Sequence, residues 1–115
     1  MDVRMDGRVA LITGGSRGLG RAMALKFAEA GAKVAITARR AEVLEEARAD
    51  IAGRTKTHVA AFPCDVGQAD QVEDMYASVI GEFGQLDILV NNAGRSETGA
   101  FEEITDAVWQ ADLDL

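Results

Sequence analysis

The sequence predicts an α/β fold in which a parallel β-sheet is covered by helices on both faces. Short apolar runs of strand length alternate along the 115 residues with longer segments of helical periodicity. A glycine-rich stretch follows the first apolar run directly and opens into the first helical segment. Strands that are separated by helices pair in parallel through right-handed crossovers, and such a sheet is doubly wound.

The first half of the chain supplies two strands and the helix between them. The apolar run 9–12 predicts a buried strand, and residues 33–37 predict the next one. Between them, apolar residues recur at helical intervals, and Gly31 is placed to cap the end of that helix. These helical positions are Leu19, Met23, Phe27 and Ala30.

The second half continues the alternation. A second helix is expected from the spacing of Val43, Leu44, Ala47 and Ile51, and we expect it to end near Gly53. A third strand, 58–62, is closed by Pro63, and a fourth covers 86–90. The third helix shows the clearest periodicity, with Gly84 just past its end and apolar residues at Val72, Met75, Tyr76, Val79, Ile80 and Phe83.

Composition limits the classes of function. With a net charge of −7 and a pI of about 4.6, the chain is a poor general partner for nucleic acid or for an anionic membrane surface. It contains no long apolar span and no signal-peptide pattern, and its single cysteine, Cys64, fits a reducing compartment. We therefore expect a cytoplasmic protein in which residues 1–115 form one domain or part of one.

The glycine-rich stretch, Thr13-Gly14-Gly15-Ser16-Arg17-Gly18-Leu19-Gly20, predicts a dinucleotide site. It lies where a buried strand turns into a helix, and a helix N-terminus attracts phosphate because its first N–H groups lack partners. Gly14 suits a tight turn, Gly18 removes a side chain where the pyrophosphate approaches, and Gly20 permits close packing of helix on strand.

The end of the second strand favours NADP over NAD. An acidic residue about 20 positions beyond the glycine loop commonly binds the adenosine ribose of NAD. Here that position is Ala38, followed by Arg39 and Arg40, whose guanidinium groups suit a 2′-phosphate. Arg17 adds a further positive group. The alternative is that Arg39 and Arg40 are only solvated residues at the start of a helix.

A second motif, Asn91-Asn92-Ala93-Gly94, follows the fourth strand. Together with Thr13-Gly14-x-x-x-Gly18-x-Gly20 and with Asp65-Val66 after the third strand, it resembles the short-chain dehydrogenase/reductase family. The resemblance extends from about Gly7 to the last residue and implies the Rossmann fold.

The resemblance also implies roles for individual residues. Asp65 would bind the adenine amino group, Val66 would pack beside the adenine ring, and Asn91 would brace the neighbouring strands. The pyrophosphate would be lined by Gly14, Ser16, Arg17, Gly18, Leu19 and Gly20, and the adenosine-side ribose by Asn92, Ala93 and Gly94. Alternatively, Asp65 only caps a turn before Gly67, and the asparagines satisfy backbone groups at the strand end.

No catalytic residue is expected within the chain. Members of this family use a Tyr as acid/base, a Lys four residues later that lowers its pKa, and a Ser that positions the substrate. The single tyrosine, Tyr76, is followed at that spacing by Ile80 and is expected in the core. The catalytic asparagine of the family would fall one position beyond Leu115, so the chain resembles the N-terminal, cofactor-binding half and is expected to be inactive alone.

Two hypotheses for the function follow. The first is an NADP(H)-dependent oxidoreductase acting on a small ketone or secondary alcohol, which the resemblance also implies is a homo-oligomer at full length. The second is a truncated, noncatalytic module for nucleotide binding or interaction. No metal site is expected, because His58 has no second His or clustered Cys near it, and Cys64 is expected to be a buried small residue.

Overall fold

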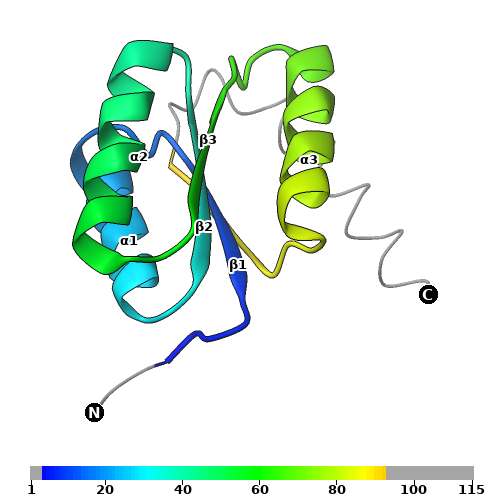
Figure 1. Cartoon of the computed structure of the whole chain (residues 1–115). Coiled ribbons are helices and arrows are strands. Elements are labelled where there is room, and N and C mark those ends of the chain that lie inside the picture. Colours follow the sequence, from blue (N-terminus) through cyan, green and yellow to red (C-terminus); the bar gives the residue numbers. More distant parts are fainter. Residues whose placement is uncertain (1–3, 93–115) are drawn as a thin grey trace.

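The structure is a computed structural model that describes residues 4–92, and it has three layers (Figure 1). The helices α1 (Gly18–Glu29) and α2 (Ala41–Thr55) cover one face of a central sheet, and α3 (Ala69–Phe83) covers the other. The predicted alternation of strands and helices is therefore confirmed.

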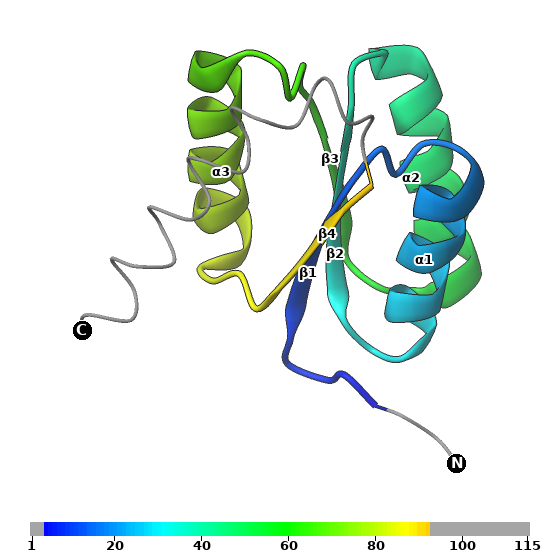
Figure 2. The same cartoon turned by 180° about the vertical axis from the view of Figure 1, so that it is seen from behind.

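All four described strands are parallel, in the order β3-β2-β1-β4. They comprise β1 (Val9–Thr13), β2 (Lys33–Ala38), β3 (Val59–Pro63) and β4 (Ile88–Asn91). The chain moves from β1 outward to β3, returns across the other face through α3, and places β4 on the free side of β1 (Figure 2). This is a doubly wound sheet of the Rossmann type.

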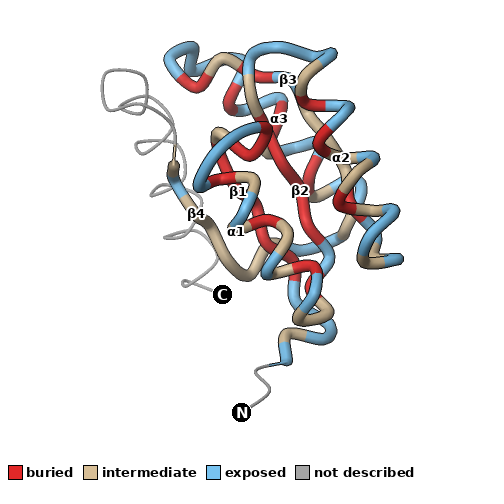
Figure 3. Tube along the Cα trace, turned by 90° about the vertical axis from the view of Figure 1, so that its left-hand side faces the viewer, coloured by how far each residue is buried: buried red, intermediate tan, exposed pale blue. Residues whose placement is uncertain are grey.

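The core consists of two apolar clusters, one on each face of the sheet. Side chains alternate along β1, so Ala10 and Ile12 pack toward α1 and α2 while Leu11 packs toward α3. Both β1 and β2 are buried, and β4 is only half-buried (Figure 3). Because a fully buried side chain of this kind contributes about 1.5–3 kcal/mol, the two inner strands anchor the fold.

The helix ends agree with the glycine positions in two cases and differ in one. Gly31 and Gly84 have positive φ of 99° and 80°, as expected for glycines that terminate α1 and α3. The expected end of α2 near Gly53 is wrong, because the helix continues to Thr55 and Lys56 takes the left-handed position with φ of 57°. A glycine inside a helix lowers helix stability by about 1 kcal/mol relative to alanine, but it keeps its backbone hydrogen bonds, so the helix continues past it.

The prediction that Tyr76 lies in the core is wrong, because its side chain is only half-buried. The buried positions of α3 are Val72, Met75 and Val79, and Tyr76 lies at the border of that stripe, about 40° around the helix from Val72 and on the side away from Met75. Among the described helices, none is long and apolar enough to cross a membrane.

Candidate dinucleotide-binding site

The candidate site lies at the carboxyl ends of the strands, where β1 and β4 are neighbours. The connection from β1 passes through α1 on one face of the sheet, and the connection into β4 passes through α3 on the other face, which creates the switch point where doubly wound proteins bind ligands. The strand ends are level, since Thr13 is paired with both Thr37 and Asn91. The glycine loop and the asparagine motif therefore begin side by side.

Two backbone hydrogen bonds tie the glycine loop to β2. The amides of Gly14 and Gly15 donate to the carbonyl of Thr37 over 2.8 and 3.3 Å. Gly14 has φ of 69°, a conformation that glycine adopts without strain, so its predicted role in a tight turn is confirmed. These bonds fix the distance between the loop and the end of the neighbouring strand.

Two further glycines are required by tertiary neighbours. A Cβ on Gly20 would meet the carbonyl of Gly14 and would stand 2.7 Å from Nδ2 of Asn92, so close packing here involves the loop and β4 together. A Cβ on Gly15 would stand 2.7 Å from Cγ2 of Ile36. Gly15 has no role that the sequence predicts, because no sequence pattern reveals that Ile36 lies opposite it.

The N-terminus of α1 is prepared for an anion. Arg17 is its N-cap residue, no side chain caps the first turn, and that turn holds no acidic residue. Gly18 has φ of 54°, and a Cβ there would meet nothing within 4 Å, so open space lies beside the helix end. Ser16 is buried and Leu19 is exposed. The donor set and the space fit a pyrophosphate group.

A threonine hydroxyl joins β1 to β4 at the switch point. Thr13 Oγ1 lies 3.1 Å from Asn91 Oδ1, to which it donates, and accepts a 2.8 Å hydrogen bond from the Asn92 amide. This contact agrees with the bracing role expected for Asn91. The Asn92 side chain lies against Gly14 and Gly20, so β4 also supports the glycine loop. Thr13 belongs to the glycine-rich motif, but the sequence does not predict its hydrogen bonds to Asn91 and Asn92.

The positive side chains of the site come from two adjacent loops. Arg17 follows β1, while Arg39 and Arg40 follow Ala38, the last residue of β2. All three arginines are exposed, and the bonds from the glycine loop to Thr37 hold the two loops together. The strand end thus presents guanidinium groups where a carboxylate would mark NAD.

Asp65 lies in the turn after β3, and its carboxylate caps that turn. Oδ1 accepts a 2.9 Å hydrogen bond from the Gly67 amide, while the Asp65 amide donates to Oε1 of Gln71. The capping role considered for Asp65 is therefore present. Val66 is buried in the cluster beneath α3. Cys64 is also buried, as expected, and burial is the main cause that raises the pKa of its thiol.

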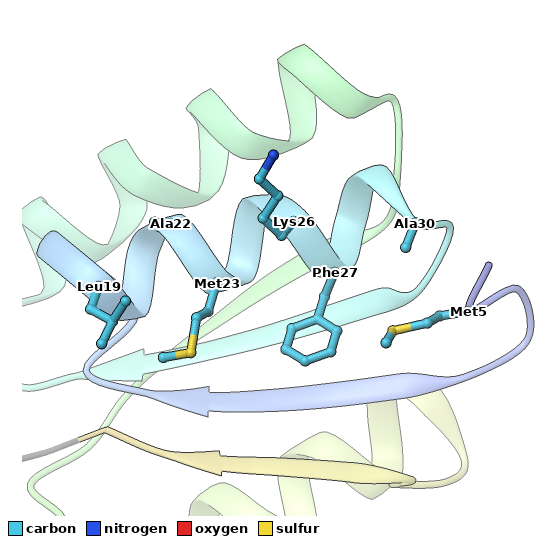
Figure 4. Close-up of a pocket in the computed structure, with 7 residues that line it drawn as sticks. All are labelled: Met5, Leu19, Ala22, Met23, Lys26, Phe27 and Ala30. Carbon is cyan, nitrogen blue, oxygen red and sulfur yellow. The ribbon is translucent and has the colours of Figure 1, made fainter. Parts of the chain in front are cut away.

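An apolar groove of about 470 Å³ lies along α1. It begins at the exposed Leu19, runs past Met23 and Phe27, and is closed by Met5 from the N-terminal segment (Figure 4). Lys26 stands at its border and points away from it. Its apolar lining excludes it as the site of the charged groups of a dinucleotide.

Two of the predicted cofactor-binding residues, Ala93 and Gly94, lie outside the described residues. Residues 4–92 contain no cluster of three or more His, Cys, Asp or Glu side chains that could hold a metal ion. His58 lies just before β3, at the end of that strand away from the candidate site, and contacts Glu82 with 2.8 Å between Nε2 and Oε2.

The match of a family model decides the identity of the chain. The model described as short chain dehydrogenase matches residues 8–115. The chain belongs to this family. A curated member, D-threitol dehydrogenase from Mycolicibacterium smegmatis, is 39% identical over 112 residues, covering 97% of this chain and 43% of the relative.

Solved structures of short-chain dehydrogenases show the same fold. The L-sorbose reductase of Gluconobacter frateurii, solved with NADPH and L-sorbose, matches with a TM-score of 0.79 and 40% identity over 82% of this chain and 36% of that protein. An NAD⁺-bound xylitol dehydrogenase matches with a TM-score of 0.75 and 36% identity over 77% of this chain and 34% of that protein. The chain thus spans less than half of each relative. Of the two solved structures, one contains NADPH and the other NAD⁺.

Proposed function

We propose that this chain is the cofactor-binding part of an NADP(H)-dependent oxidoreductase that interconverts a small ketone and a secondary alcohol. Membership of the short-chain dehydrogenase family supports oxidoreductase chemistry. The noncatalytic alternative gains no support, since the relatives described above are dehydrogenases and a reductase. The observation that carries the cofactor choice is the end of β2, where Ala38 is followed by Arg39 beside the glycine loop.

The described residues would bind the dinucleotide in three places. The N-terminus of α1 and the open space at Gly18 would receive the pyrophosphate. Arg39, supported by Arg17, would bind the 2′-phosphate through charge-assisted hydrogen bonds. Oδ1 of Asp65 accepts the hydrogen bond of the turn from Gly67, and Oδ2 would accept a hydrogen bond from the adenine amino group.

The bound nicotinamide would supply hydride transfer. The residues described here position and hold the cofactor, and the Ser, Tyr and Lys of the family are assigned to polypeptide beyond residue 115. Tyr76 does not replace them, because Ile80 occupies the position of the lysine that would lower its pKa. We also propose a cytoplasmic location and a homo-oligomeric assembly for the full-length protein.

The test compares the two cofactors directly. The protein expressed from its complete reading frame is titrated with NADPH and with NADH, following nucleotide fluorescence, to obtain the ratio of the NADH and NADPH dissociation constants. We expect NADPH to bind more tightly. Arg39→Asp removes an attraction and adds a repulsion, so the ratio should fall by about 10- to 100-fold.

Arg8→Asp is the matched control. It makes the same change of charge at an exposed arginine just before β1, at the end of the sheet opposite the glycine loop. A preference of the unmodified protein for NADH would contradict the assignment of NADP. An equal drop in both variants would show that overall charge, and not Arg39 itself, sets the preference.

A further inference from the structure

An ion-pair network joins α1 to α2 behind the phosphate-binding loops. The Arg21 guanidinium, on the first turns of α1, contacts two carboxylates of α2 at 2.8 Å each, those of Glu46 and Asp50. Arg54 also contacts Asp50, at 2.9 Å. The Arg21 side chain is only 29% exposed, whereas that of Glu46 is 64% exposed, so the guanidinium is the sheltered centre of the network.

Arg21 is also bonded to the glycine loop. Its amide donates a 3.2 Å hydrogen bond to the carbonyl of Arg17, the residue that precedes α1. On the other side, α2 begins directly after Arg40, whose carbonyl accepts a 3.0 Å bond from the Leu44 amide. One residue is therefore tied both to the loop that carries Arg17 and to the helix that follows Arg39.

Apolar packing is less directional than an ion pair. The buried residues of the two helices are the small Ala24, Ala28 and Ala47 together with the larger Leu44 and Ile51. Such packing resists separation of the helices, and the alanines add little resistance to sliding. The described part of the chain shows no other side-chain ion pair between α1 and α2. Directed bonds from a planar guanidinium supply the missing constraint.

We infer that Arg21 is a positioning residue for cofactor selection, which clamps α2 against α1 and so holds the turn bearing Arg39 and Arg40 at the distance that a 2′-phosphate requires. The inference rests on the proposed NADP(H) dependence. The two bonds from the glycine loop to Thr37 fix only the end of β2. The direction of the turn beyond it depends on where α2 lies.

The ion pairs of the network are charged at neutral pH. Hydrogen bonds from Arg21, and then from Arg54, lower the pKa of the Asp50 carboxyl below its usual value. The hydrogen bonds that Arg21 donates to Glu46 and Asp50 raise the pKa of Arg21. Both shifts favour the charged forms, so the clamp is present at neutral pH.

Three variants of the protein made from its complete reading frame separate positioning from charge. Arg21→Gln removes the clamp and one positive charge. Arg48→Gln removes the same charge from α2 but breaks only a contact with Glu45 on the same helix. Glu46→Gln removes a negative charge and half of the clamp, and Arg21 keeps Asp50 as a partner. The readout is the ratio of the NADH and NADPH dissociation constants.

Positioning requires that Arg21→Gln lower this ratio by about three- to tenfold, in the lower part of the range expected for coupled neighbouring groups. Glu46→Gln should lower it less but in the same direction, and Arg48→Gln should leave it unchanged. An unchanged ratio in Arg21→Gln overturns the inference. A raised ratio in Glu46→Gln also overturns it, since a pure charge effect would strengthen NADPH binding.

If Arg21→Gln yields too little folded protein, Glu46→Gln decides alone by the sign of its effect. The unmodified protein tests the proposed function separately. Preference of that protein for NADH overturns both proposals, whereas NADPH preference with an unaffected Arg21→Gln ratio overturns only the clamp.

Discussion

Replacement of Gly20 by alanine should destabilise the protein, although alanine is normally the better helix residue. A Cβ at this position would meet the backbone carbonyl of Gly14 and the amide of Asn92. The Asn92 amide group is the end of a side chain and can turn aside, but the Gly14 carbonyl is backbone, so the loop must shift. Overpacking of this kind costs about 1–3 kcal/mol, against a gain of up to about 1 kcal/mol from helix propensity. We expect a net loss of about 1–2 kcal/mol.

Gly53→Ala is the matched control. Gly53 also lies within a helix, and a Cβ there would meet nothing within 4 Å. The same substitution should therefore stabilise the protein by about 0.5–1 kcal/mol. The two variants differ only in their tertiary neighbours, so their effects should have opposite signs.

Urea denaturation followed by circular dichroism measures both effects as shifts of the midpoint at constant m-value. Affinity for NADPH should fall in Gly20→Ala, because Gly14 and Asn92 both move, and should stay unchanged in Gly53→Ala. The reasoning is refuted if Gly20→Ala unfolds at the same or a higher urea concentration than the unmodified protein.

Two other predictions follow from the same geometry. Gly18→Asn should weaken NADPH binding by at least about tenfold with little loss of stability, because asparagine tolerates the positive φ of 54° while its side chain fills the phosphate space. Gly84→Asn is the control, because Gly84 also has a positive φ and open surroundings. Equal NADPH affinity in the two variants would contradict the role assigned to Gly18. The lowered pKa of Asp50 means that its contribution to stability is present above its unfolded pKa and is lost as pH falls through its folded pKa. The difference in Tm between the unmodified protein and Asp50→Asn should therefore shrink from pH 5 to pH 2, and a constant difference would show that the charge of Asp50 is not involved.

The position of the site was predictable because it depends on local patterns. A buried strand, a glycine-rich turn and a helix are specified by adjacent residues, and Gly14 takes the positive φ that its place in the turn suggests. Parallel pairing then follows from the helices between the strands, so the carboxyl ends of β1 and β4 had to meet at one edge. Arg39 could be placed at that edge from its spacing alone.

What the sequence by itself determined was therefore the order of elements and the edge at which the motifs gather. The tertiary structure alone decided which atoms meet there, since those contacts join residues far apart in the chain. Ile36 requires a glycine at position 15, and the Thr13 hydroxyl bonds both Asn91, at the end of β4, and Asn92 after it. The contact of Arg21 with α2 depends on how two amphipathic helices rotate against each other, which periodicity fixes only coarsely.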